Sequence, residues 1–134
     1  MSDFRKLEVW RKAHDVMIEV HAIAGAIRGG AYLSLKSQII RAAMSIPANI
    51  VEGRAQRSER DFSRFLSYAI ASTSELEYHL VAARDIGAVE GSEANPIIRR
   101  VIEVRRMLIG LRKALTESAD RRSPPPGAVA PGSS

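Results

Sequence analysis

Few side chains in this sequence could bind a metal ion, and their spacing does not match a known ligand pattern. The three histidines are His14, His21 and His79. A di-iron site in a helical bundle uses Glu-x-x-His, because that spacing projects two ligands inward from successive turns. None of the histidines has a glutamate three residues before it. Glu75 and His79 are four residues apart and could share an ion, but an ordinary helix-surface pair is the simpler interpretation. We expect no metal.

Arrangements for nucleophilic catalysis or cofactor binding are also missing. The chain has no cysteine, which excludes thiolate chemistry and disulfides and fits a reducing compartment. No serine lies in a Gly-x-Ser-x-Gly motif. The glycines at positions 25, 29, 30 and 53 form no phosphate-binding loop of the Walker or dinucleotide type. The sequence therefore predicts no catalytic residues, no cofactor and no enzyme activity.

The basic residues are the more informative set. The formal net charge is +5 and the pI is about 10.1. Most basic side chains are arginine, whose planar guanidinium binds phosphate through two parallel hydrogen bonds. Two groups have a regular spacing and are the candidate nucleic-acid-binding residues: Arg54, Arg57, Arg60 and Arg64, and then Arg99, Arg106 and Lys113. Stripes of this kind can follow a phosphate backbone.

An alternative is that these basic residues are ordinary solvated helix faces, interleaved with Glu59, Asp61 and Glu103. Aromatic residues make up only 5% of the chain, so stacking on single-stranded bases is not expected. Any nucleic-acid binding would then be driven by charge and by the shape of the duplex. We rank the group that begins at Arg54 first and the group that begins at Arg99 second.

Four helices must position these residues. Apolar residues recur at spacings of three and four over residues 7–28, 34–54, 58–86 and 95–118, which is typical of amphipathic helices. Pro47 lies inside the second stripe and predicts a bend there. Ser58 is a good N-cap for the third helix. Asn95 followed by Pro96 resembles a helix start, so we place the beginning of the fourth helix there.

The fourth helix carries two apolar stripes. The first alternates steps of four and three and forms a heptad seam for the bundle core. The second consists of Ile98, Ile102 and Ile109. Because one bundle core needs a single stripe, these three isoleucines are our candidate oligomer interface.

The whole chain fits one domain. Its length of 134 residues matches one hydrophobic core. No uncharged apolar run approaches the roughly 20 residues of a membrane span, and the first residues do not resemble a signal peptide. We expect a cytoplasmic all-α protein: an antiparallel up-and-down four-helix bundle over residues 1–118, followed by a disordered Pro/Gly/Ser-rich tail over 119–134.

Four segments resemble a known family, the four-helix-bundle proteins encoded in intervening sequences of bacterial 23S ribosomal RNA genes. The segments read FRKLEVWRKA at residues 4–13, QIIRAAMSIPANIVEG at 38–53, FSRFL at 62–66 and SELE at 74–77. The Ser-Ile-Pro-x-Asn-Ile-x-Glu-Gly stretch is the most specific. The sequence differs from the family pattern at residues 71–73, where a Gly-Ser pair is usual.

The resemblance implies a homopentamer, because members of this family assemble into rings of five. Relatives include the accessory variability determinant of diversity-generating retroelements, a basic pentamer that binds nucleic acid and a reverse transcriptase. We therefore expect a non-catalytic homo-oligomer that binds structured RNA or DNA through its arginine-rich faces. The alternative is a protein–protein interaction scaffold that docks an unidentified protein partner without binding nucleic acid.

Overall fold

The protein is an all-α bundle. The computed structural model describes residues 3–122, the side chains of Lys6, Ala119 and Arg122 excepted, and within that range it contains four α-helices and no strand. Two short 3-10 helices, Phe4–Lys6 and Gly30–Tyr32, precede the first and second α-helices. The four are α1 (Glu8–Ala26), α2 (Leu33–Arg54), α3 (Glu59–Asp85) and α4 (Gly91–Arg122).

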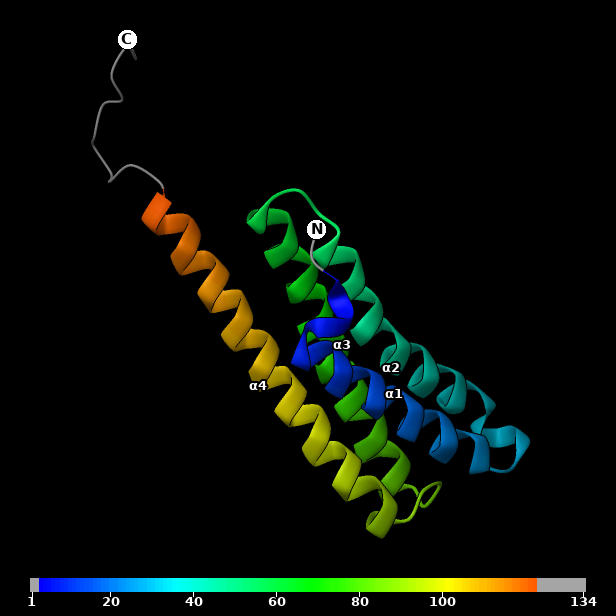
Figure 1. The fold of residues 1–134 in the computed structure, drawn as a ribbon. Coiled ribbons are helices and arrows are strands. Elements are labelled where there is room, and N and C mark those ends of the chain that lie inside the picture. The colour runs from blue at the N-terminus through cyan, green and yellow to red at the C-terminus, as the bar shows by residue number, and fades with distance from the viewer. Residues whose placement is uncertain (1–2, 123–134) are drawn as a thin grey trace, which may run out of the picture.

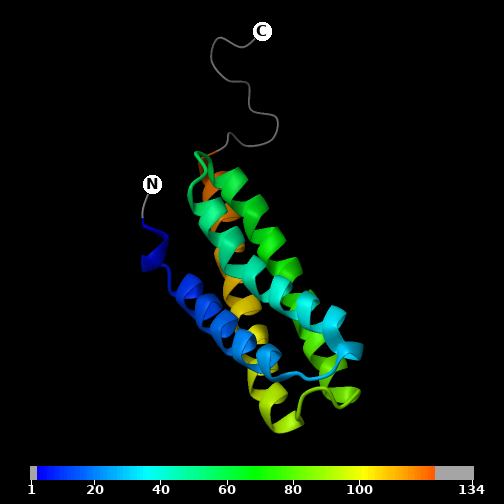
Figure 2. The ribbon, with the colours of Figure 1, turned by 90° about the vertical axis from the view of Figure 1, so that its right-hand side faces the viewer.

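The helices run up and down in sequence order (Figure 1). Each packs on its neighbour in the chain, and α4 closes the bundle against α1. In the described range, α1 does not contact α3, and α2 does not contact α4. These two pairs therefore lie on the diagonals, as the view in Figure 2 also shows. The antiparallel four-helix bundle expected from the sequence is confirmed.

The core is aliphatic and is built from the predicted apolar stripes. Its largest fully buried side chains include Ile39, Ile46, Ile50, Leu66, Leu76, Leu80 and Leu108. Each such side chain contributes about 1.5–3 kcal/mol on burial. Since all four helices supply residues to one cluster, the bundle folds around a single core.

Three residues in the middle of the chain illustrate how local signals act. α2 continues through Pro47, so the helix does not break there, and the expected bend stays a prediction. The amide of Asn49 donates to the carbonyl of Ser45 at 2.8 Å, so this polar side chain satisfies backbone within α2. The Ser58 hydroxyl caps α3 by accepting from the backbone N–H of Asp61 at 3.1 Å.

The boundaries of α4 differ from the expected ones. The helix begins at Gly91 rather than near Pro96, because Ala94 is fully buried in the core and its N–H donates to the carbonyl of Glu90 at 2.9 Å. Pro96 therefore removes one hydrogen bond inside the helix, close to its start. At the other end α4 continues to Arg122, four residues past the expected boundary, since the first helix-breaking residue is Pro124. The rest of the expected tail, residues 123–134, lies outside the described residues.

α1 is much shorter than α4, with 19 residues against 32. Two ion pairs join α1 to the first half of α4: Lys12 with Glu103, and Glu19 with Arg100. Because α1 begins at Glu8, near the level of Glu103, the second half of α4 packs mainly on α3.

Candidate functional site

The outward face of α4 carries a regular row of cations, which we call the α4 basic stripe: Arg99, Arg106 and Lys113. The three residues are seven positions apart, which places them on one side of the helix at intervals of about 10.5 Å. All three are exposed, and none forms an ion pair or a hydrogen bond with another described residue. The stripe is therefore a row of free positive charges on a rigid support.

Other arginines of α4 are used inside the protein. Arg100 pairs with Glu19 on α1, and Arg105 pairs with Glu77 on α3 at 2.5 Å. Arg112 donates to the hydroxyl of Ser67 on α3 at 3.1 Å. These side chains join neighbouring helices, so only the α4 basic stripe remains available to an external anion on this helix up to Lys113.

The acidic residue that we expected to neutralise this region is itself paired. Glu103 accepts a hydrogen bond from the ammonium group of Lys12 at 2.7 Å. That bond and the positive charge of Lys12 hold the pKa of Glu103 below its ordinary value. The same bond and the negative charge of Glu103 raise the pKa of Lys12. The pair keeps the Glu103 carboxylate on the α1 side of α4. After Glu103, the next acidic residue along α4 is Glu117, one turn beyond Lys113.

Two residues of the first-ranked group extend the basic surface. Arg60, in the first turn of α3, is exposed and has no ion-pair or hydrogen-bond partner among residues 3–122. It lines a small hollow together with Thr116 and Asp120 of α4. Asp120 is seven residues beyond Lys113 and thus on the same face, so Arg60 lies at the C-terminal end of the α4 basic stripe. Arg57 is exposed in the turn before α3.

Arg54 and Arg64 have other roles. The guanidinium carbon of Arg54 lies 5.8 Å from the centre of the Phe62 ring, and its Nε is buried without a hydrogen-bond partner among the described residues. Arg64 pairs with Asp61 at 3.7 Å and lies over the ring of Phe65. Of the four arginines that sequence spacing had grouped together, Arg57 and Arg60 are therefore exposed without a partner in the described range, whereas Arg54 and Arg64 contact neighbouring side chains.

The candidate oligomer interface on α4 is only partly on the surface. Ile98 is buried in the core and Ile102 packs against the core, whereas Ile109 is 42% exposed. A helix in a four-helix bundle contacts two neighbours as well as the centre, which explains the extra width of the apolar face without a second copy. Ile109 alone remains exposed for a partner on this stripe.

Sequence reasoning overlooked an apolar row on the outward face of α2. Leu33, Ile40, Met44 and Ala48 are spaced by sevens and fours on the side opposite the core stripe of that helix, and they line a shallow hollow. The sequence does contain a signal for this row, because a helix that is apolar on two sides has more apolar surface than one core can cover.

A metal site needs several ligand side chains close together. Within residues 3–122, no group of three or more His, Asp or Glu side chains could hold a metal ion. The Nε2 of His79 lies 3.5 Å from the carboxylate of Glu75, and the two residues are one helical turn apart on α3. Glu75 is exposed, whereas the side chain of His79 is mostly buried. None of the described helices is both long and apolar enough to cross a membrane.

The fold and its surfaces define a class of protein: a small four-helix bundle with a basic outer helix. The model of the 23S rRNA-intervening sequence protein family matches residues 5–110, which is most of the chain. The chain belongs to that family, and the resemblance stated from the sequence is confirmed.

A solved structure shows the same fold. It is the crystal structure of a protein with unknown function from the S23 ribosomal protein family of Bacteroides thetaiotaomicron. The two chains are 24% identical, with a TM-score of 0.74, and the match covers 78% of this chain and 98% of the other. No sequence among the curated proteins matches this chain.

Proposed function

We propose that this protein is a non-catalytic, cytoplasmic homo-oligomer that binds structured RNA or DNA through the α4 basic stripe and Arg60. The proposal rests on one observation, which is that the basic residues of α4 differ in whether they have partners inside the protein. Those that face α1 and α3 are paired, whereas Arg99, Arg106 and Lys113 are exposed and unpaired. Free guanidinium groups at regular spacing suit the phosphates of a duplex.

The oligomer that we propose is a pentamer, and its support is the family resemblance. The name of the family also refers to ribosomal RNA, which makes a structured RNA the first probe to use. Recognition would rest on phosphate contacts and duplex shape, because the stripe contains no aromatic side chain for base stacking.

A fluorescence-anisotropy titration tests the proposal. The probes are an RNA hairpin and a DNA duplex of matched length, each at low and physiological salt. A variant with Arg99, Arg106 and Lys113 all replaced by Ala should bind more weakly. For DNA, the slope of log K against log salt should fall by up to about 2.7, since each phosphate contact contributes about 0.9.

The matched control replaces Arg11 and Arg28 with Ala and is compared with the double variant in which Arg99 and Arg106 are replaced by Ala. Arg11 and Arg28 are exposed and have no ion-pair partner in the described range, and their loss removes the same charge from α1 and the loop that follows it. If both double variants weaken binding equally, the loss of net charge alone explains the effect, and the proposed site is wrong. If wild-type protein binds neither probe at either salt, the protein–protein scaffold becomes the better account.

A further inference from the structure

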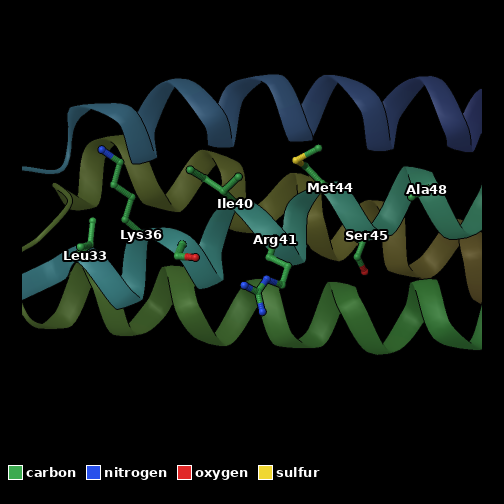
Figure 3. A pocket seen from close by; sticks show the side chains of 8 residues that line it. Leu33, Lys36, Ile40, Arg41, Met44, Ser45 and Ala48 are labelled. Atoms are coloured by element: carbon green, nitrogen blue, oxygen red, sulfur yellow. The ribbon is translucent and has the colours of Figure 1, made fainter.

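α2 carries an open, mostly apolar hollow on its surface. Leu33, Ile40, Met44 and Ala48 line it along four turns of the helix, with a volume of about 690 Å³ (Figure 3). Leu33 is 69% exposed and Met44 is 52% exposed. We call this surface the α2 hollow.

The bundle leaves much of the α2 hollow exposed. α1, α3 and both 3-10 helices contact α2, and Ile40 packs against the core, but Leu33, Met44 and Ala48 in the lining remain exposed. Large exposed apolar residues grouped on one face of a helix indicate an interaction surface. The charged residues in the lining are Lys36 and Arg41, and the lining includes no acidic residue. A complementary surface would therefore be apolar with carboxylates at its margin.

The exposed side of α3, together with its C-cap, has those properties. Tyr68 and Tyr78 of α3 and Ile86 at the C-cap are among the most exposed large apolar residues described. Tyr78 is 68% exposed. Glu75 and Asp85 are exposed in the second half of the helix, where Glu75 lies 3.5 Å from Nε2 of His79 and Asp85 pairs with Arg84. We call this surface the α3 aromatic face.

Contact between two copies of the α2 hollow is disfavoured by charge. A symmetric α2–α2 contact would place Lys36 and Arg41 of one copy against the same residues of the other, with no carboxylate in the lining to separate them. Like charges facing each other across an interface cost several kcal/mol. Contact between two different faces avoids this repulsion.

We propose that the α2 hollow is the docking site for the α3 aromatic face of a second copy of this chain. The inference rests on the homo-oligomer of the proposed function and assigns its interface. A contact between two different faces is heterologous, so repeating it closes a ring or continues as a filament. Because α4 is diagonal to α2, this contact leaves the outward side of α4, with the α4 basic stripe, away from the α2 interface.

Three single substitutions at exposed apolar positions test the proposal by light scattering after size exclusion. Met44→Glu disrupts the α2 hollow, and Tyr78→Glu disrupts the α3 aromatic face. Ile109→Glu is the matched control, because Ile109 is an exposed apolar residue on α4 that we earlier considered as an interface residue. Circular dichroism and thermal melts establish that each variant is folded.

We expect wild type and Ile109→Glu to be oligomers, and Met44→Glu and Tyr78→Glu to shift to the 14.7 kDa mass of one chain. Each of these two variants retains one intact face, so mixing them in equal amounts should produce a dimer at twice that mass. Dimer formation from two monomeric variants is the specific signature of a head-to-tail contact.

Other outcomes overturn the inference in recognisable ways. If Met44→Glu remains an oligomer, the α2 hollow is not the interface, although the proposed homo-oligomer stands. If Met44→Glu is monomeric while Tyr78→Glu is not, the assignment of the α3 aromatic face is wrong. If wild type itself is monomeric at tens of micromolar, the oligomer of the proposed function fails, and nucleic-acid binding is judged separately by the anisotropy titration.

Discussion

Gly53, near the end of α2, lies directly against the ring of Phe62 on α3. A Cβ atom at position 53 would stand 2.8 Å from Cδ1 of Phe62 and 2.9 Å from Cβ of Phe65. The glycine of the Ile-x-Glu-Gly motif therefore permits a close approach of two helices just before the turn that joins them.

Replacing Gly53 with Ala should destabilise the protein by about 1–2 kcal/mol. Overpacking a core typically costs 1–3 kcal/mol, which exceeds the gain in helix propensity of somewhat under 1 kcal/mol. Urea unfolding followed by circular dichroism measures the difference. Gly25→Ala in α1 is the control, because a Cβ there meets nothing within 4 Å and the variant should be as stable as wild type or slightly more so. Equal effects at the two positions would refute the packing explanation.

Arg54 should contribute to stability rather than to nucleic-acid binding. Arg54→Ala removes the guanidinium that lies over Phe62 and the aliphatic stem beneath it, a loss of about 1 kcal/mol. Affinity for an RNA hairpin should be unchanged. Arg60→Ala, at an exposed position, should have the opposite pattern: unchanged stability and weaker binding. If Arg54→Ala lowers the affinity for RNA without a loss of stability, Arg54 belongs to the nucleic-acid-binding surface and the prediction is wrong.

The comparison of these arginines shows what sequence spacing can predict. Seven-residue intervals within one unbroken helix placed Arg99, Arg106 and Lys113 on one face, because helical geometry alone fixes that relationship. Arg54 precedes a turn, and its surroundings depend on how the chain reverses there, which spacing does not specify.

The same distinction holds for the fold. The core stripes were predictable from their periodicity, whereas the start of α4 was not, because the tertiary contact that buries Ala94 extends the helix upstream of Pro96. The α2 hollow was overlooked because its apolar residues could be assigned to a surface or a core only after the neighbours of α2 were known.

The ion pair between Lys12 and Glu103 predicts a dependence of stability on pH. The pKa of Glu103 in the folded protein is lowered from 4.5, first by its hydrogen bond from Lys12 and then by the charge of Lys12. A carboxyl group with a lowered folded-state pKa contributes stability that is present above its unfolded pKa and is lost as the pH falls through the folded value.

Glu103→Gln removes that contribution and should be less stable than wild type at pH 7. The difference between the two proteins should shrink as the pH falls below about 4.5, the ordinary pKa of the group. Urea is the suitable denaturant, because guanidinium salts screen ion pairs. A difference that stayed constant from pH 7 to pH 3 would show that titration of Glu103 is not its cause.

The hydroxyl groups of Ser45 on α2 and Ser72 on α3 are hydrogen-bonded to each other, which joins the two helices at a point where Ser72 is almost fully buried. Ser45→Ala or Ser72→Ala leaves the remaining hydroxyl without this partner and should cost about 1 kcal/mol. The double variant removes both polar groups together, so it should be no less stable than either single variant. A double-mutant cycle in urea measures this coupling directly. Additive losses would instead mean that each hydroxyl bonds to its own helix backbone, and the link between α2 and α3 would then rest on apolar packing alone.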